Sequence, residues 1–366
     1  MASLSIILVH YHTPRLLMRA VASLRADLAD SGTEAEIVVI DNGSTVEERD
    51  IIRTLGVSVL EPGRNLGYAG GVNLGVAATT GDHVILMNSD VDVFPGCLGR
   101  LRATLTDGIA AAGPRFFWDR ERLVMFPPTE IRDRYSELER RAANYSTLLA
   151  VRARQRWRTH ARRHWSARDP INSYALSGGL LAVRRDAWTA VGPFDEGFPL
   201  YFEESDWLQR LAQRGFPARY VPSAEALHHH DQSAGGKPAL AQWFAQSAHR
   251  FAQRHYGVWF AAILRSLDLL APPRQNGQCL ASGVPEITLA HDATPARFWV
   301  EYSPSRLGFP ATTARIEKGS RTWRVPDEVL RLLGAGTHHL RLVDDTGHEI
   351  SHVAFTQPPG LEPKRV

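Results

Sequence analysis

Short apolar runs alternate with amphipathic segments through the first half of the chain. Four runs have the composition of buried strands, and two intervening segments place apolar side chains at helical spacing. The strands are expected at residues 5–9, 36–40, 57–60 and 82–87, and the helices at residues 14–28 and 73–79. Strands and helices in this order predict an α/β fold with a mostly parallel central sheet covered by helices.

The pattern changes after residue 270. Residues 271–277 are rich in Pro, Gly and Asn and predict a linker, beyond which Gly and Pro turns separate short alternating runs. These strands are expected at residues 286–290, 298–302, 313–316, 322–325, 338–343 and 350–356. We therefore predict a domain over residues 1–272 and a small, sandwich-like, all-β accessory domain over residues 273–366. It could bind carbohydrate, dock a partner or cover the first domain.

Composition narrows the class of protein. The 366 residues are 44% hydrophobic and 22% charged, which is enough to bury a sizeable core, and the net charge of +3 argues against a nucleic-acid binder. Cys97 and Cys279 are too far apart in sequence to suggest a disulfide framework. No stretch approaches the roughly 20 apolar residues of a membrane span, and the first residues lack the features of a signal peptide. These features predict a cytoplasmic protein.

Two carboxylates follow the apolar run that ends at residue 87. Asp90 and Asp92 stand one residue apart, beyond the carboxyl end of a predicted strand, where open α/β sheets bind ligands. Tyr11 and Asp41 follow other strands and are expected at the same sheet edge. Oxygen ligands suit a hard divalent cation, so we predict an ion held against a diphosphate. A solvated turn is the alternative for a lone Asp-x-Asp pair.

Several short motifs within residues 3–260 are each weak evidence for a protein family, but their order and spacing together are strong evidence. They are SIILVHYHTP (5–14), IVVIDNGS (37–44), RNLGYAGGVNLG (64–75), NSD (88–90), SGG (177–179), GPFDE (192–196) and YFEESD (201–206). In order and spacing this series resembles the family 2 inverting glycosyltransferases, in particular their rhamnosyltransferase-like branch. The resemblance implies a GT-A nucleotide-sugar-binding domain.

The resemblance also implies a donor site and a metal site. The donor residues would be Tyr11, Asp41, Arg64, Asn65, Gly67, Gly71, Asn73, Ser89 and Asp90. Asp41 would accept a hydrogen bond from the imide N–H of uracil or thymine, or would cap a helix. The metal, Mg²⁺ or Mn²⁺, would be held by Asp90, Asp92 and His228. Of the two carboxylates, Asp90 aligns best with the family's metal-binding residue, and His230 is an alternative to His228.

The second acidic cluster supplies the implied catalytic residue. The family's base falls on Glu204, where Glu replaces the usual Asp, and Asp206 is the reserve candidate. Such a base takes the proton of the attacking hydroxyl. The alternative is that these carboxylates stabilise a helix N-terminus through its dipole. The acceptor site would comprise Gly178, Gly179, Glu203 and Trp207.

The resemblance implies that residues 119–172 are an insertion in a part of the chain that varies within the family, and their composition predicts an Arg-rich helical segment. Seven arginines between residues 152 and 168 occur with Trp157 and Trp165. Such a helix could meet a membrane surface or a polyprenyl-diphosphate-linked acceptor, because arginine binds phosphate in a bidentate manner. The alternative is a solvated helix whose arginines extend over a packed face.

Together the sequence predicts an inverting, metal-dependent glycosyltransferase of bacterial surface-polysaccharide synthesis. The donor would be dTDP-rhamnose or a UDP-sugar, and the acceptor a glycan or a lipid-linked sugar. A catalytically silent nucleotide-sugar or glycan-binding protein is the alternative. The expected location is the cytoplasm, with peripheral contact at the inner face of the membrane as an option, and no nucleic-acid partner is expected.

Overall fold

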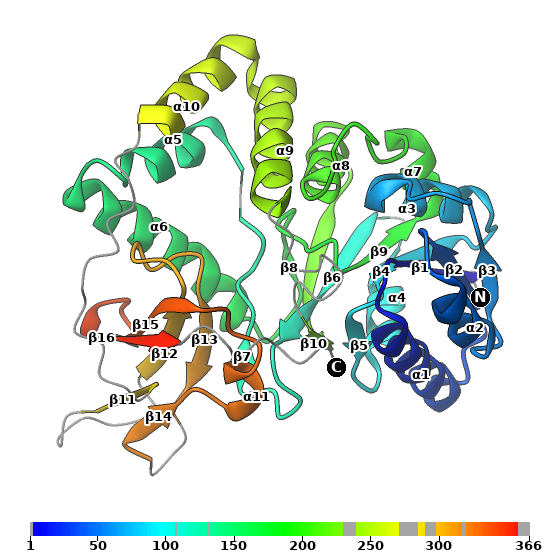
Figure 1. Ribbon diagram of the computed structural model, residues 1–366, viewed down its shortest axis with the longest axis horizontal. Coiled ribbons are helices and arrows are strands. Elements are labelled where there is room, and N and C mark those ends of the chain that lie inside the picture. The colour runs from blue at the N-terminus through cyan, green and yellow to red at the C-terminus, as the bar shows by residue number, and fades with distance from the viewer. Residues whose placement is uncertain are drawn as a thin grey trace. The chain divides into compact units, whose positions relative to one another are not determined.

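In the computed structural model the N-terminal strands form a parallel core sheet (Figure 1). The structure describes residues 3–106, 108–130, 132–229, 239–270, 285–289, 298–316 and 320–357. The chain divides into two compact units: residues 1–116 with 167–261, and residues 117–166 with 262–366. The boundary expected between residues 272 and 273 lies outside the described residues. The division into catalytic and accessory domains therefore stays a prediction.

The sheet of the first unit confirms the α/β prediction. Its strands are β1 (Leu4–His10), β2 (Glu36–Asp41), β3 (Ser58–Leu60), β4 (His83–Asn88), β9 (Leu180–Arg184) and β6 (Ala111–Phe117). They are ordered β6-β9-β4-β1-β2-β3, with the pairs among β1 to β4 parallel and β9 antiparallel to both of its neighbours. Every residue of β1 is buried, as expected for a strand flanked on both sides.

Register brings the polar strand ends together. His10 of β1 lies opposite Asp41 of β2, and Val9 lies opposite Asn88 of β4. The segments that follow these strands therefore start from the same edge of the sheet. The expectation that Asp41 and Asp90 follow strands ending at one edge is in agreement with this register.

The first unit contains helices that pack on its strands or on one another. They are α1 (Pro14–Ser31), α2 (Val46–Arg53), α3 (Gly67–Ala77), α4 (Cys97–Thr104), α7 (Arg185–Val191), α8 (Glu203–Gln213) and α9 (Ala239–Tyr256). The helix expected at residues 73–79 in fact begins at Gly67, because its glycines belong to the helix. A Cβ on Gly75 would clash with Ile7 Cγ2, so this glycine lets α3 pack directly on β1.

A long strand, β10 (Ala218–His228), carries the chain back across the acidic turn. It pairs antiparallel with β5 (Val91–Val93) and with β8 (Ile171–Asn172). In this register His228 lies opposite Val91, and the His229 amide donates to the Asp90 carbonyl at 2.9 Å. The strand therefore brings the histidines to the carboxylates that follow β4.

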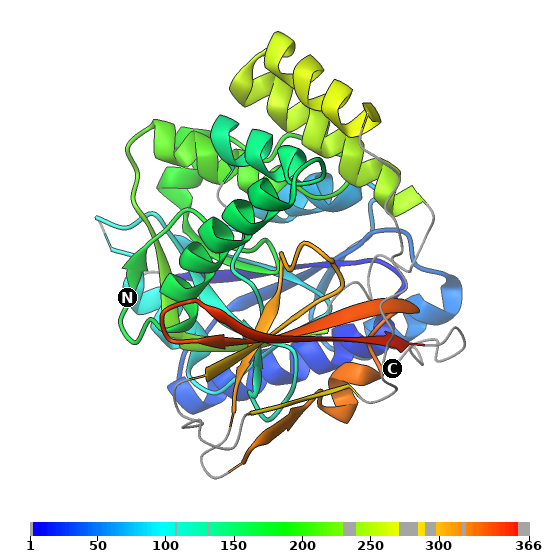
Figure 2. The same cartoon turned by 90° about the vertical axis from the view of Figure 1, so that its left-hand side faces the viewer.

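The second unit confirms the C-terminal strands (Figure 2). Its antiparallel sheet has the order β16-β15-β12-β13-β7, and β11 pairs with β14 in a separate small sheet. The bounds are β7 (Val124–Met125), β11 (Glu286–Thr288), β12 (Phe298–Ser303), β13 (Thr312–Arg315), β14 (Thr322–Arg324), β15 (Gly336–Asp344) and β16 (Glu349–Gln357). Buried side chains of both sheets share one hydrophobic cluster, which includes Ile287 and Val300.

The helices α5 (Arg134–Ala142), α6 (Thr147–Trp165) and α11 (Asp327–Leu330) complete the second unit, and α10 (Val258–Leu270) follows α9. Trp157 and Trp165 of α6 are buried, with ring centroids 6.4 Å from Phe309 and Trp299 respectively. This aromatic packing explains why the Arg-rich segment belongs to the same unit as the C-terminal strands. None of the helices in the described ranges is long and apolar enough to cross a membrane.

Candidate active site

The turn after β2 is organised by two side chains of the predicted donor segment. Asp41 is buried, and its Oδ1 accepts from the Ser44 amide at 2.9 Å. The helix-capping role proposed for Asp41 belongs instead to Thr45, which forms a capping box with Glu48 at the start of α2. Asp41 therefore shapes the turn that precedes the helix, and its part in base recognition stays a prediction.

The loop before α3 is held from the β2 turn. Asn42 Oδ1 accepts from the Leu66 amide at 2.7 Å, and its Nδ2 donates to the Gly67 carbonyl at 3.0 Å. Gly67 has a φ of +73°, which favours glycine. Arg64 and Asn65 are exposed on this loop, in keeping with a contact to a bound donor.

Two other residues of the predicted donor site, Gly71 and Asn73, make packing or hydrogen-bond contacts inside the first unit. A Cβ on Gly71 would lie 2.9 Å from Val9 Cγ1, so this glycine permits helix–strand packing. Asn73 donates to the Phe194 carbonyl at 3.0 Å and to Glu196 at 2.9 Å, and accepts from the Phe194 amide. Asn73 thus links α3 to the GPFDE segment, a role that the motif alone did not indicate.

Tyr11 and Ser89 lie at the ends of β1 and β4. The Tyr11 ring contacts His12 with centroids 4.4 Å apart, and Tyr11 is half-buried. The Ser89 hydroxyl lies 2.9 Å from that of Thr13, which ties the two strand ends together. At the end of β1, burial lowers the pKa of His10 to about 4, so this imidazole is neutral at pH 7.

The structure brings Asp90 and His228 together. Asp90 is only 1% exposed, and its Oδ1 lies 3.4 Å from His228 Nε2. The His228 ring also lies against Phe116 and close to Gly179, where an added Cβ would be 3.4 Å from Cε1. Two of the three predicted metal ligands therefore share one position in the first unit.

Asp92 lies in a different environment from Asp90. Its Oδ2 accepts from Arg19 at 2.8 Å and lies 3.1 Å from His229 Nε2. Burial alone would raise the pKa of Asp92, but His229 and Arg19 together lower it. His228 and His229 face different carboxylates because successive side chains of a strand alternate. His230 lies outside the described residues.

The candidate ligand side chains fit a divalent cation whose coordination shell is completed by oxygens of the substrate. Within the described ranges, no group of three or more His, Cys, Asp or Glu side chains is placed to hold an ion together. Mg²⁺ binds in many sites through one or two carboxylates plus phosphates and water. Asp90 with His228 fits such a partial site, whereas the ion pair with Arg19 makes Asp92 a poorer ligand.

The two glutamates at the start of α8 differ in burial. Tyr201 and Phe202 adopt φ of +66° and +74°, and α8 begins directly after them at Glu203. Glu203 is 5% exposed, and its Oε2 has no hydrogen-bond partner among the described residues. Burial, followed by the charge of Glu204, raises the pKa of Glu203 well above its usual value. Strained backbone of this kind is concentrated at functional sites.

Glu204 lies half-buried against a glycine. A Cβ on Gly178 would be 3.1 Å from Glu204 Cγ, and Glu204 Oε1 accepts from the Ser205 hydroxyl at 3.1 Å. The Tyr68 hydroxyl donates to the Gly178 carbonyl at 2.8 Å. Gly178 therefore allows the predicted base to approach a segment that Tyr68 holds.

Tyr68 connects the two acidic clusters, although it was not among the predicted site residues. Burial raises the pKa of its hydroxyl strongly, and the charges of Glu203, Glu204 and Asp90 raise it further. Gly178, whose carbonyl accepts from Tyr68, lies against Glu204, and the adjacent Gly179 lies against His228, the partner of Asp90. The aromatic position in the GYAGG run was the available sequence signal for this residue.

Asp206 and Trp207 are enclosed in the protein. Asp206 is 0% exposed and forms ion pairs with Arg210 at 2.9 Å, Arg254 at 3.1 Å and His255 at 2.8 Å. Burial alone would raise its pKa, but these partners lower it, which makes Asp206 a weak base. Trp207 is fully buried and stacks on Trp188, so the structure places it in the core and out of reach of an acceptor.

The Arg-rich helix α6 uses its arginines inside the second unit. Arg158 forms a bidentate pair with Glu301 at 2.6 and 2.8 Å, Arg154 donates to the Leu307 carbonyl, and Arg162 donates to the Asp344 carbonyl. These contacts, with the buried tryptophans, favour the packing interpretation over a lipid-facing helix.

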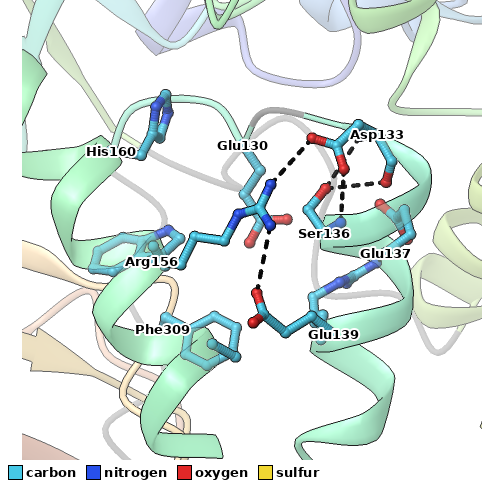
Figure 3. A pocket seen from close by; sticks show the side chains of 11 residues that line it. Glu130, Asp133, Ser136, Glu137, Glu139, Arg156, His160 and Phe309 are labelled. Carbon is cyan, nitrogen blue, oxygen red and sulfur yellow. Dashed lines mark hydrogen bonds and ion pairs between the residues drawn. The ribbon is translucent and has the colours of Figure 1, made fainter. Parts of the chain in front are cut away.

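A cavity of about 120 Å³ lies between α5, α6 and Phe309 in the same unit (Figure 3). Arg156 extends between Asp133 and Glu139, with N–O distances of 3.4 and 3.9 Å. None of the predicted site residues lines this cavity. The candidate active site is therefore the cluster around Tyr68, Asp90, His228 and Glu204 in the first unit.

Known proteins resemble this chain at several levels. The model of glycosyl transferase family 2 matches residues 5–166. The N-acetylglucosaminyl-diphospho-decaprenol L-rhamnosyltransferase of Mycobacterium tuberculosis is 31% identical over 281 residues, 71% of this chain and 87% of that protein. Rhamnosyltransferase WbbL of Escherichia coli is 32% identical over 80 residues, 21% of this chain and 30% of that protein. The mannosyltransferase PcManGT of Pyrobaculum calidifontis superposes with a TM-score of 0.46 and 13% identity, covering 74% of this chain and 76% of that structure.

Proposed function

This chain belongs to glycosyl transferase family 2, and from that premise we propose the reaction that this glycosyltransferase performs. It transfers a sugar from a nucleotide-diphosphate sugar to a hydroxyl of a glycan or lipid-linked acceptor, with inversion at the anomeric carbon. The α/β architecture is the one expected of a GT-A domain. Inversion, metal dependence and the identity of both substrates are parts of the proposal.

One observation carries the proposal. Asp90 with His228, and Glu204, meet at the adjacent Gly178 and Gly179: an added Cβ would lie 3.1 Å from Glu204 Cγ at Gly178 and 3.4 Å from His228 Cε1 at Gly179. Burial and the charge of Glu204 raise the pKa of the buried Glu203, whereas Glu204 beside it is half-buried. Pairs whose environments push their pKa values apart are typical of acid–base sites.

Glu204 is the proposed base. Its carboxylate takes the proton of the acceptor hydroxyl as that oxygen forms a bond to the anomeric carbon. The bond from that carbon to the diphosphate oxygen breaks, and the nucleoside diphosphate leaves with the electron pair. Attack opposite the leaving group inverts the configuration. The raised pKa of the neighbouring Glu203 favours its neutral form, which would add no second negative charge beside the base.

Asp90 and His228 would hold the divalent cation, Mg²⁺ or Mn²⁺. When bound, such an ion neutralises charge on the departing diphosphate. Arg64 is exposed on the loop before α3 and would contribute a further positive charge to the donor phosphates. Asp92 would act indirectly, because its pair with Arg19 and His229 fixes the strand that carries His228.

The substrates are proposed from the named relative and from the β2 turn. That relative is a rhamnosyltransferase acting on an N-acetylglucosaminyl-diphospho-decaprenol, which supports dTDP-rhamnose as donor and a polyprenyl-diphosphate-linked sugar as acceptor. Buried Asp41 can accept from the imide N–H of thymine or uracil, so a UDP-sugar is the alternative donor. The reaction would take place on the cytoplasmic side of the membrane.

Thermal stabilisation by a panel of UDP-, dTDP-, GDP- and CDP-sugars, with Mn²⁺ or EDTA, tests the proposal. We expect a metal-dependent shift with one thymidine or uridine donor, and we expect Asp90→Asn to abolish it. An unchanged shift in Asp90→Asn with Mn²⁺ would contradict the metal assignment. Donor binding without nucleotide release in the wild-type protein would favour a silent nucleotide-sugar-binding protein instead.

A further inference from the structure

The helix α10 exposes large apolar side chains to solvent. Trp259 is 85% exposed, and Val258, Ile263, Leu269 and Leu270 are also more than half exposed. Isolated exposed apolar residues are common, but a set of five on thirteen residues forms a patch that needs a partner. We call these five residues the α10 face.

Helical geometry places these side chains on one side. At about 100° per residue, positions 258, 259, 262, 263, 266, 269 and 270 fall within an arc of about 140°. The two remaining positions of this arc are Ala262 and Ser266, so it contains no charge. Arg265 lies just outside the arc, is exposed, and has no ion-pair partner among the described residues.

The opposite side of α10 is already in contact with protein. Ala261 and Leu264 are buried, Arg141 Nε donates to Asp268 at 3.0 Å, and the Tyr145 hydroxyl donates to the Leu267 carbonyl. Contacts with α5 and with the turn that follows it thus fix the rotation of the C-terminal half of α10 about its own axis. The α10 face points away from these contacts.

We propose that the α10 face lies in the headgroup region of a phospholipid bilayer. The inference rests on the proposed function, because a polyprenyl-linked acceptor keeps its apolar chain in the bilayer and the enzyme must come to it. None of the described helices spans a membrane, so contact through them must be at the surface. An exposed Trp, long aliphatic side chains and a flanking Arg are the composition of an interfacial helix.

The test uses the full-length protein and vesicles of phosphatidylcholine and phosphatidylglycerol without acceptor. The double variant Trp259→Asp/Leu270→Asp removes two anchors, and Ile263→Asp is a second variant on the same face. Ile350→Asp is the matched control, since Ile350 is also exposed but lies on β16. Melting temperatures confirm that each variant is folded, and co-sedimentation gives the partition coefficient.

We expect the wild-type protein and the Ile350→Asp control to bind vesicles equally and the double variant to bind at least about tenfold more weakly. Wild-type protein that stays in the supernatant, or a folded double variant that binds like the wild type, would overturn the proposal. Concentration-dependent dimerisation that the same variant abolishes, without vesicle binding, would assign the α10 face to a second copy of the chain.

A second measurement separates this inference from the proposed reaction. The double variant should transfer sugar to a water-soluble short-chain acceptor at the wild-type rate, but at least about tenfold more slowly to a long-chain acceptor in vesicles. Equal loss with both acceptors would overturn the membrane role. If the wild type transfers to neither acceptor, the proposed function fails, while the vesicle-binding result still decides whether the α10 face meets lipid.

Discussion

Replacing Asp206 by Asn distinguishes a structural carboxylate from a catalytic one. The Asp206 side chain is fully buried and joins α8 to α9 through Arg254 and His255, and it also pairs with Arg210 within α8. Asparagine keeps the shape and removes the charge. We therefore expect a loss of stability with little change in turnover, because no described contact connects Asp206 to the cluster around Tyr68.

The size of the effect follows from burial and pairing. Breaking a buried ion pair costs about 3–5 kcal/mol. Arg254 is partly exposed, so solvent screens its contribution, and Asn still accepts a hydrogen bond. We expect about 3 kcal/mol, at the lower end of this range. For a unit of about 200 residues this corresponds to a fall in Tm of about 6–12 °C.

The dependence on pH provides a second check. The partners lower the pKa of Asp206, so its stabilising contribution is present above the unfolded-state pKa of about 3.9 and is lost as pH falls through the folded-state pKa. The difference in Tm between wild type and Asp206→Asn should therefore narrow below about pH 4. Calorimetry gives Tm, and nucleotide release well below Tm gives kcat. A change in Tm under 2 °C with turnover reduced about 10²-fold would refute this account.

Two further substitutions act closer to Glu204. Gly178→Ala places a Cβ 3.1 Å from Glu204 Cγ and should lower kcat about tenfold by displacing the base. Gly99→Ala, whose added Cβ would meet no atom within 4 Å, is the control and should leave kcat unchanged. Equal kcat in both variants would contradict a close fit at Gly178. Because the folded-state pKa of Glu203 is raised, the wild type loses stability as pH rises above about 4.3, and Glu203→Gln removes this loss. The Tm of Glu203→Gln relative to wild type should therefore be higher at pH 8 than at pH 5, and a constant difference would show that the pKa of Glu203 is not raised.

Continuous apolar runs made the central sheet predictable. The strands β1, β2 and β4 are buried on both faces, so their composition alone identifies them. Because parallel strands end at the same edge, the residues after them could be grouped as one site before any contact was known. The second acidic cluster became part of that site only through the order of motifs along the chain.

The partners of individual carboxylates could not be predicted in this way. Asp206 pairs with His255, 49 residues later, and Asp92 pairs with Arg19, 73 residues earlier. Periodicity predicts the face on which a side chain lies but does not identify the residue opposite. The aromatic packing of α6 on the C-terminal strands depends on contacts of the same long-range kind. The sequence therefore did not show that α6 belongs to the same unit as those strands.

Donor-dependent transfer by Glu204→Gln tests the central claim most directly. Rates of nucleotide release with acceptor are compared for the wild type and Glu204→Gln, and donor binding is measured on the same preparations. The account predicts unchanged donor affinity and transfer at least about 10²-fold slower in Glu204→Gln, the scale of a lost general base. If Glu204→Gln transfers sugar at the wild-type rate with equal donor affinity, Glu204 is not the base, and the mechanism proposed for this site is contradicted.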